Sequence, residues 1–497
     1  MINFSKFSNF SYKMFYTMFV LAFAWIFFIN VQVDLEIGMI ILMVFFIFLA
    51  GFVGFKKMIN EKKDIELAST ILGKIVEVAS WLLLFIIISI IGLFLRVTPT
   101  WDYGMVHRYS LEWVQQGKID DLSYFARYPN NNLMLLITAG FYRIIYFFSS
   151  TALEETYIRA SIILNSFLVT LSIYLTSVSA KKMYGNSFKK ITVFFLVFFT
   201  PIIFYTEIFY TDIIGLIIIS SLSYIFISKI ANFNVKDAIL VGTIIGVGFK
   251  VKAFILIILV ALVIVLFLKN NKLFREKIIL ILVAVVSFVI VDITLTNGMD
   301  KVIGLNEELY EQYQFPTSHW IMMSLNPKED GGFVQADYEE TRDIEGKGNK
   351  DRLAKEKRTK RVEELGTKGL INHLLYKKVK RTWSVGSMGV NDYGQRKNVY
   401  QSFLHDFMTR NGKYHKYYYI LSQSTHLILI FFMLICGGIS FFRRNDELNI
   451  LNITIFGLLL FLIIWECNSR YLFSFIPFFT LSALSVISNT KKEVNIE

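Results

Sequence analysis

Cysteine, histidine and charged residues are scarce in this sequence. Its two cysteines, Cys436 and Cys467, provide no disulfide framework and no cysteine-based metal site. Its six histidines are scattered without metal-ligand spacing. The sequence therefore requires no metal or cofactor, although a divalent ion is compatible with it.

The sequence is instead rich in long apolar runs. Hydrophobic residues make up 55% of the chain and charged residues only 18%, more apolar surface than a soluble protein could bury. The runs have the length of roughly 17–22 residues that crosses a bilayer. The first run has no small-residue cleavage site and further runs follow it, so we expect no cleaved signal peptide. The runs are 14–31, 38–55, 78–96, 132–149, 158–180, 190–208, 212–228, 238–249, 252–268, 279–296, 421–442, 448–465 and 470–487. They predict an all-α polytopic membrane protein.

Short basic loops predict which ends of the runs face the cytoplasm, because lysine and arginine collect on that side. The net charge of +12 lies partly in these loops and indicates no nucleic-acid partner. The basic loops are 56–63, 181–190, 228–236, 269–277, 443–444 and 491–492. If every run crossed, loop 181–190 would fall outside. The run 132–149 has Arg143 near its centre, so we expect it to lie along the membrane as a juxtamembrane helix.

This layout predicts about twelve transmembrane helices in the cytoplasmic membrane, with both termini on the cytoplasmic side. The run 238–249 is short, but Gly242 and Gly246 have the small-xxx-small spacing of closely packed membrane helices. Four parts follow along the chain: two extra N-terminal spans with a cytoplasmic loop (1–77), a core with an external loop at 97–157 (78–296), an external loop domain (297–420) and the C-terminal spans (421–497). Within the loop domain, roughly 351–380 can form an amphipathic helix.

Ionisable residues gather at the predicted external ends of the runs. They are Asp102, Arg127, Glu207, Asp212, Lys250, Lys252, Glu466 and Arg470. Charged groups at membrane depth usually face a cavity or one another, so the fold is expected to bring acids and bases together there. Each residue alone has a simpler interpretation. Asp102 fits an interfacial cap, the two lysines fit snorkelling anchors, and Arg470 fits a partner of Glu466 one helical turn earlier.

A carboxylate beside basic groups at the lipid–water boundary suits one reaction in particular. The carboxylate removes a proton from an acceptor hydroxyl as general base. That hydroxyl attacks the anomeric carbon of a sugar carried on a lipid phosphate. Lysine and arginine then neutralise the charge that develops on the departing phosphate.

Several motifs occur in an order that is typical of one family. They are WDYG (101–104), YPNNN (128–132), KKMYGNSFKK (181–190), FYTEIFYTD (204–212), FPTSHWIMMSLN (315–326) and ECNSRYLFSFIP (466–477). With them, the chain from about 78 to 487 resembles the GT-C superfamily of membrane glycosyltransferases. The resemblance is greatest to the bacterial branch related to protein O-mannosyltransferases and the aminoarabinose transferase of lipid A.

The resemblance implies a role for each matching residue. It makes Asp102 the catalytic base, and Asp212 or Glu207 a second acid that orients the acceptor or the base. It makes Lys250, Lys252, Arg470 and Arg127 ligands of the donor phosphate, with Glu466 placing Arg470. The other motif residues expected to support the site are Trp101, Tyr103, Tyr128, Asn130 and His319. No second acidic residue follows Asp102 directly, which favours a single-base mechanism without a metal requirement.

The resemblance also implies the substrates. The donor would be a sugar on polyprenyl phosphate, such as undecaprenyl phosphate, and transfer would invert the anomeric carbon. The acceptor would be a cell-envelope polymer outside the cytoplasmic membrane: teichoic acid, lipoteichoic acid or a wall polysaccharide. The transferred unit would be a hexose or an N-acetylhexosamine.

Other functions fit parts of the same pattern. A transporter or flippase for a lipid-linked sugar would need polar groups near the bilayer midplane, whereas here they lie at span ends. A polymerase or ligase that moves a whole oligosaccharide would share the same basic groups. A scaffold without catalysis leaves the grouped acids and bases unexplained.

Overall fold

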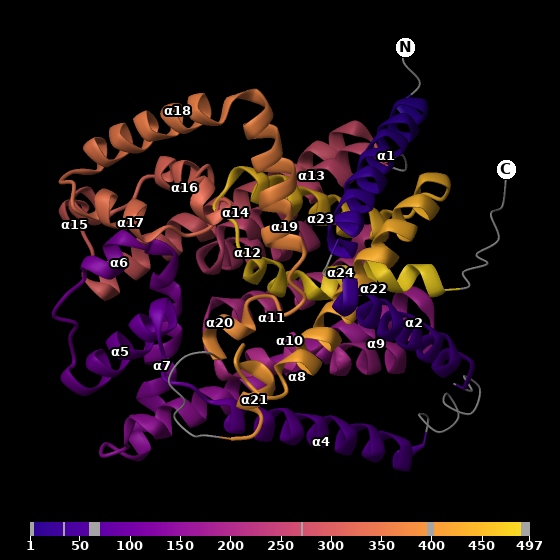
Figure 1. The fold of residues 1–497 in the computed structure, drawn as a ribbon, viewed down its shortest axis with the longest axis horizontal. Coiled ribbons are helices and arrows are strands. Elements are labelled where there is room, and N and C mark those ends of the chain that lie inside the picture. The colour runs from indigo at the N-terminus through magenta and orange to yellow at the C-terminus, as the bar shows by residue number, and fades with distance from the viewer. Residues whose placement is uncertain (1–3, 33–34, 59–69, 270–271, 395–401, 489–497) are drawn as a thin grey trace.

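Helices form the regular structure of this chain (Figure 1). The computed structural model describes residues 4–32, 35–58, 70–269, 272–394 and 402–488. These residues contain no β-strand. The prediction of an all-α protein is confirmed.

The apolar runs fold into long helices. Across the described ranges, ten helices are long and apolar enough to cross a membrane, and one pair bent by 70°, Ser187–Phe198 with Thr200–Glu207, raises this number to eleven. The helices of the bundle are α1 (Phe4–Val31), α2 (Leu35–Met58), α4 (Ile71–Leu95), α7 (Asn132–Phe148), α8 (Glu154–Tyr184), α9 (Ser187–Phe198), α10 (Thr200–Phe204), α11 (Thr211–Lys229), α12 (Val235–Val251), α13 (Leu256–Leu268), α14 (Phe274–Ile303), α22 (His415–Phe442), α23 (Asp446–Ile464) and α24 (Ile476–Leu484). The exact number of spans stays a prediction, because α12 (17 residues) and α13 (13 residues) are short for helices that cross a bilayer.

Helix α7, which corresponds to the run 132–149, has two different faces. Its buried side includes Met134, Leu135 and Tyr142, whereas Arg143 and Phe147 are exposed. Helix α5 (Trp101–Gln116) packs along it. The segment Pro129–Phe148 is also long and apolar enough to cross, so its course along the membrane stays a prediction.

Short helices of other types connect the long ones. They are the 3-10 helices η1 (Pro129–Asn131), η2 (Tyr205–Glu207), η3 (Ile230–Asn232), η4 (Ala253–Ile255), η5 (Pro327–Glu329), η7 (Ser469–Phe475) and η8 (Ser485–Ile487), and the π-helix η6 (His373–Lys377). Three of them, η2, η4 and η7, lie where long helices are interrupted next to the ionisable residues.

Glycine lets α12 approach α14 closely. A Cβ atom on Gly242 would lie 2.3 Å from the carbonyl oxygen of Ala284, and one on Gly246 would lie 2.8 Å from Val291. Only glycine fits at such distances. The expected close packing of this short helix is therefore confirmed, and the partner is α14.

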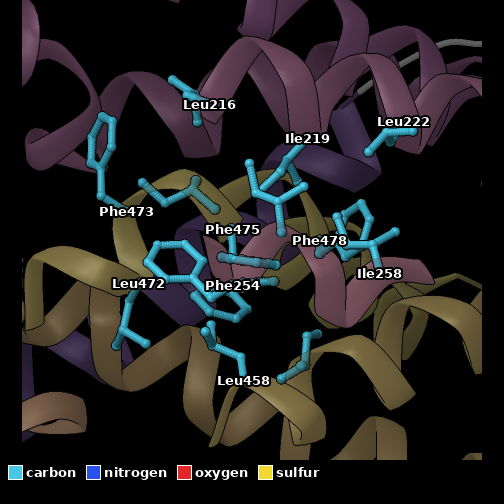
Figure 2. Close-up of a cluster of buried hydrophobic side chains, with 14 of the residues drawn as sticks. Leu216, Ile219, Leu222, Phe254, Ile258, Leu458, Leu472, Phe473, Phe475 and Phe478 are labelled. Atoms are coloured by element: carbon cyan, nitrogen blue, oxygen red, sulfur yellow. The ribbon is translucent and has the colours of Figure 1, made fainter. Parts of the chain in front are cut away.

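The centre of the bundle is a layer of interlocking apolar side chains. Leu216 and Ile219 of α11 face Phe473 and Phe475 of η7, with Phe254 between these elements and α23 (Figure 2). Dense packing of this kind fixes the helices relative to one another. It holds the ends of α11, α12 and η7, which carry the ionisable residues, in one place.

Four of the six basic loops meet at one end of the bundle: 181–190, 228–236, 269–277 and 443–444. The loop 491–492 and most of 56–63 lie outside the described residues. Lys269 donates hydrogen bonds to the carbonyl oxygens of Ile230 (2.5 Å) and Ala231 (2.6 Å), and Arg444 donates one to Leu268 (3.0 Å). Lys182 from loop 181–190 reaches Ser228 at 2.9 Å. Loops that are far apart in sequence thus share one face, as expected if they all lie on one side of a membrane.

Residues after α14 form a further group of helices, which we call the external layer because the sequence predicts that it lies outside the membrane. It contains α15 (Glu307–Tyr313), α16 (Thr317–Ser324), α17 (Gln335–Arg342), α18 (Lys347–Asn372), α19 (Lys378–Trp383), α20 (Val390–Gly394) and α21 (His405–Met408), and α6 (Ser123–Arg127) of the first loop packs against α15. In Figure 1, α15 to α18 lie together above α5 and α6. The expected helix at 351–380 spans α18, η6 and the start of α19, with a kink at Gly366 (φ 58°).

Candidate functional site

Asp102 stands in the first turn of α5, shortly after α4 ends at Leu95. Its carboxylate is partly exposed and accepts a 2.8 Å hydrogen bond from the hydroxyl of Tyr124. A negative charge is favourable at the start of a helix, where backbone N–H groups are unpaired. The position thus leaves the carboxylate of Asp102 accessible, with one hydrogen bond from the protein.

A chain of hydrogen bonds ties this carboxylate to α11. Asn131 donates to the hydroxyl of Tyr124 (2.7 Å) and accepts from the hydroxyl of Tyr210 (2.6 Å). Tyr210 directly precedes α11. Asp102 therefore has a fixed orientation relative to Asp212, which follows Tyr210 by two residues.

Asp212 forms a buried ion pair. Its Oδ1 atom lies 2.5 Å from Nζ of Lys252, and the two side chains are 0% and 7% exposed. Lys252 reaches it because α12 ends at Val251, so the chain turns towards α11 at this point. A buried carboxylate is expensive without such a partner.

Arg470 is the second cation of this cluster. Its Nε atom is 4.0 Å from Oδ2 of Asp212, and it donates a hydrogen bond to the hydroxyl of Tyr393. Its guanidinium group lies 5.7 to 5.9 Å from the ring centres of Tyr210, Tyr393 and Tyr471. Aromatic faces of this kind hold an arginine in place without neutralising its charge.

Trp101 connects the two halves of the cluster. Its ring is 48% exposed and meets the ring of Tyr393 edge-on, with 5.2 Å between centres. This contact places Asp102, the next residue, near Tyr393, which accepts the hydrogen bond from Arg470. One cluster contains Asp102, Asp212, Lys252 and Arg470, and we call it the acid–base cluster.

The hydrogen bonds of the acid–base cluster are incomplete. Oδ2 of Asp212 and Nε of Arg470 are both buried without a hydrogen-bond partner among the described residues. A buried polar atom without a partner costs about 1–3 kcal/mol. The cluster can therefore accept a further polar group, and Arg470 has a free donor for an anion.

The backbone is strained at two points of the same site. Trp101 (φ 53°) and Met388 (φ 48°) have positive φ, which is costly for side chains of their size. Met388 accepts a 2.7 Å hydrogen bond from Tyr205, and Gly389 after it lies against Arg470. Strain of this kind is concentrated at functional sites.

The structure places two predicted phosphate ligands outside the cluster. Lys250 lies 2.5 Å from Asp292 and 2.6 Å from the hydroxyl of Thr296, so α14 already neutralises it. Arg127 is surrounded by the rings of Tyr313, Phe315 and Tyr338, each about 6 Å away, and bonds to the Tyr338 hydroxyl at 3.3 Å. The assignment of both residues to the donor phosphate is not supported by this geometry.

Glu466 does not pair with Arg470 on a helix. Helix α23 ends before Trp465, and Asn468 starts the 3-10 helix η7, so the spacing of four residues does not bring them together. Glu466 instead accepts a hydrogen bond from the hydroxyl of Tyr471. Burial raises the pKa of Glu466, and this hydrogen bond opposes the shift.

Glu207 is also separate from the acid–base cluster. It is 1% exposed, and neither carboxylate oxygen has a hydrogen-bond partner within the described ranges. The backbone carbonyl of its neighbour Thr206 accepts a 3.0 Å hydrogen bond from Asn165 of α8. Of the two candidates for the second acid, only Asp212 meets the cations of the cluster.

The remaining predicted residues have packing roles. Tyr103 is 1% exposed. The ring of Tyr128 contacts that of Tyr124 at a tilt of 58°, with 5.2 Å between centres, and Asn130 bonds weakly to Asn131 (3.4 Å). His319 lies in the external layer, 2.8 Å from the hydroxyl of Thr341. Of these four, only Tyr128 and Asn130 adjoin residues that hold Asp102.

Sequence reasoning missed the side chains that orient the charged groups. Tyr124, Asn131 and Tyr210 orient Asp102, while Tyr393 orients Arg470. Asn131 and Tyr210 lie inside quoted motifs, which is a signal that could have found them. Tyr393 has no such signal, since only the fold brings α20 to the site.

Metal-binding groups are not seen in the parts of the chain that the structure describes. These parts contain no group of three or more His, Cys, Asp or Glu side chains that could hold an ion. The acid–base cluster has two carboxylates, and each is bonded to a protein group.

Comparison with known proteins places the chain in a family. A search of the curated proteins finds no match. Residues 3–491 match the model of a family described as conserved hypothetical integral membrane protein, which spans nearly the whole chain and agrees with its apolar helices. This protein therefore belongs to that family of integral membrane proteins.

Proposed function

We propose that this protein is a membrane glycosyltransferase. It moves a sugar from a polyprenyl-phosphate donor to a hydroxyl group of a cell-envelope polymer outside the cytoplasmic membrane. The observation that carries this proposal is the acid–base cluster, in which an accessible carboxylate lies near a partly buried arginine whose Nε atom makes no hydrogen bond among the described residues. Transfer from a lipid phosphate needs both groups in one site at the membrane edge.

Asp102 acts as general base in this proposal. It takes the proton of the acceptor hydroxyl as that oxygen bonds to the anomeric carbon. The bond from the anomeric carbon to the phosphate oxygen breaks, and the electron pair leaves with the polyprenyl phosphate. The proton remains on Asp102 until it is released to water, and attack opposite to the leaving group inverts the anomeric carbon.

Arg470 and Lys252 act on the departing phosphate. Arg470 contributes its unpaired Nε, while Lys252 and Asp212 form a pair that keeps the surroundings close to neutral before the donor binds. Preorganised donors of this type are effective because they do not reorganise during the reaction. The aromatic rings around Arg470 fix its plane for that role.

The arrangement of charges supports an external site. Four of the basic loops meet at the end of the bundle opposite to the acid–base cluster, and such loops mark the cytoplasmic side. The cluster then faces outwards, where lipid-linked sugars and envelope polymers meet. Both termini are cytoplasmic in this arrangement.

The test is the Asp102→Asn variant, compared with cells that carry no copy or the wild type. Its transfer rate should fall by about 10²–10⁴-fold, the usual contribution of a general base. The measurement is the sugar composition of the envelope polymers and transfer from a polyprenyl-phosphate sugar by purified protein. Asp121→Asn is the matched control, since Asp121 lies in the same loop and caps the amide of Ser123 at 2.8 Å.

The outcomes separate the possible functions. A sugar that is missing in the null strain and with Asp102→Asn, but present with Asp121→Asn, supports the proposal and identifies what is transferred. Loss in the null strain alone keeps the transferase and moves the base to Asp212. An unchanged envelope in all strains that make the protein contradicts transfer and favours transport of a lipid-linked sugar.

A further inference from the structure

The segment that covers the acid–base cluster begins at a carbonyl group held by two membrane helices. We call residues 383–394 the roof segment. The carbonyl oxygen of Trp383 accepts hydrogen bonds from Asn30 of α1 (3.0 Å) and from His426 of α22 (2.7 Å). Asn30 and His426 are 3% and 2% exposed. The start of the roof segment is thus fixed inside the bundle.

Gln423 completes this attachment. Its amide nitrogen donates to the side-chain oxygen of Asn30 (3.0 Å), and its amide oxygen accepts from the backbone N–H of Gly386 (2.9 Å). A Cβ atom on Gly386 would lie 2.5 Å from the carbonyl oxygen of Ser422, so the turn fits α22 closely. We call Asn30 and Gln423 the latch. The amide nitrogen and the amide oxygen of both latch residues each have a hydrogen-bond partner from another element.

The other end of the roof segment touches the acid–base cluster. Beyond Gly386, the carbonyl of Met388 is bonded to Tyr205, and a Cβ atom on Gly389 would lie 3.3 Å from Cβ of Arg470. Tyr393 then accepts the hydrogen bond from Arg470 and meets Trp101. The strained φ of Met388 needs support from both sides, because an unsupported segment would relax.

We propose that Asn30 and Gln423 are positioning residues for the acid–base cluster, which they reach through the roof segment. Helix α1 is then part of the site, although the sequence suggests that the first two spans are an addition to the core. The effect on catalysis rests on the proposed function, whereas the effect on the roof segment does not. An experiment can therefore disprove the effect on catalysis without disproving the effect on the roof segment.

The experiment measures how accessible the roof segment is. Ser387, which is 7% exposed, is replaced by cysteine, and its labelling by a maleimide is timed in purified full-length protein. The chain without this cysteine gives the background from the buried Cys436 and Cys467. The labelling rate is then compared after Asn30→Leu and after Gln423→Met, which remove the latch but keep the side-chain volume nearly constant.

Tyr16→Phe is the matched control on the same helix. Tyr16 is 1% exposed and donates a 2.7 Å hydrogen bond to Asn449 of α23, far from the roof segment. Removing the latch should increase the labelling rate about tenfold, because loss of buried hydrogen bonds favours local opening. Tyr16→Phe should leave the rate within about twofold of the reference, since a bond outside the opening unit does not affect it.

Transfer kinetics give the second measurement. Loss of the latch should raise the KM for the lipid-linked donor several-fold, with a smaller change in kcat, because Arg470 loses the orientation that Tyr393 gives it. Tyr16→Phe should change neither. Unchanged labelling in both latch variants, or an equal increase with Tyr16→Phe, overturns the proposal. Faster labelling in a protein that transfers no sugar supports the latch and refutes the glycosyltransferase function instead.

Discussion

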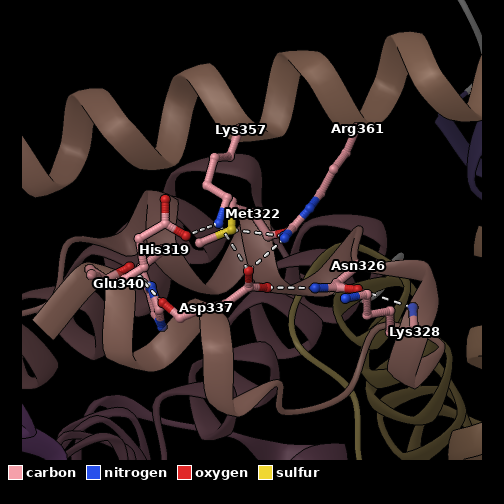
Figure 3. Close-up of polar contacts among 9 residues, drawn as sticks. His319, Met322, Asn326, Lys328, Asp337, Glu340, Lys357 and Arg361 are labelled. Carbon is pink, nitrogen blue, oxygen red and sulfur yellow. Dashed lines mark hydrogen bonds and ion pairs between the residues drawn. The ribbon is translucent and has the colours of Figure 1, made fainter.

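Two clusters of charged residues in this protein use the same residue types but differ in how completely they are bonded. In the external layer, Asp337 accepts hydrogen bonds from Arg361 (2.6 Å), Asn326 (2.8 Å) and Lys357 (3.3 Å) (Figure 3). Burial acts to raise the pKa of Asp337, but these partners outweigh it and hold the pKa below its usual value. This cluster has no unused acceptor on its carboxylate.

The acid–base cluster differs at the corresponding point. Asp212 is bonded through one oxygen to Lys252, while the other oxygen is buried without a hydrogen bond. Arg470 stands at 4.0 Å, too far for a hydrogen bond. A complete network stabilises a fold, whereas an incomplete one keeps free bonding capacity for a ligand. The comparison therefore assigns structure to the external cluster and binding to the other.

The largest effect should come from breaking the complete network. Asp337→Asn leaves the largely buried Arg361 without its counter-charge, whereas Lys357 keeps its ion pair with Glu340, so the protein should lose about 3 kcal/mol of stability. Thermal unfolding of the purified protein measures this loss. The control is Asp343→Asn, whose ion pair with Arg342 is exposed on both sides (64% and 41%) and should contribute less than about 1 kcal/mol. Equal losses in the two variants would show that the Asp337 network is not structural.

The next largest effect should come from the incomplete network. Arg470→Gln should raise the KM for the lipid-linked donor by about 10- to 100-fold, the value of a hydrogen bond to a charged group, with little change in stability. Arg127→Gln is the control, because the aromatic rings around Arg127 and its bond to Tyr338 keep it out of the cluster. A donor KM that rises with Arg127→Gln and not with Arg470→Gln would restore the sequence-based assignment of Arg127.

The sequence predicted the helices and part of the acid–base cluster. Apolar runs specify helices because a membrane demands internal backbone hydrogen bonds, and charged residues at their ends indicate a site. Asp102, Asp212, Lys252 and Arg470 follow from this reasoning, and the structure brings them together. Their detailed partners do not follow, because they depend on which residue ends each helix.

Lys250 and Lys252 illustrate this limit. They are two residues apart, and the resemblance implies the same role for both. Because α12 ends at Val251, Lys250 remains on the helix and faces Asp292, whereas Lys252 lies beyond it and reaches Asp212. The same reason separates Glu466 from Arg470.

The smallest expected effect is a dependence of the external layer on pH. Burial lowers the pKa of His319 to about 4, with Asp337 opposing and Arg361 and Lys357 adding to the shift. Below about pH 6.5 the unfolded chain binds a proton at His319, whereas the folded chain does not. The free energy of unfolding therefore decreases as the pH is lowered through this range. Between pH 8 and pH 5 the loss should be about 2 kcal/mol.

His319→Gln should reduce the loss between pH 8 and pH 5 by about 2 kcal/mol, because glutamine does not titrate. Other histidines with a lowered pKa, such as the buried His373, contribute the dependence that remains. The measurement is thermal unfolding of the full-length protein at pH 8 and pH 5, with and without the substitution. The Asp337 carboxylate does not contribute in this window: its folded pKa lies below the usual value, so its stabilisation is lost only at lower pH. Donor binding at the acid–base cluster should not change with pH in this window, since it depends on Arg470, which stays charged throughout. A pH dependence of the same size with and without His319→Gln would mean that His319 is not a group through which the external layer senses acid.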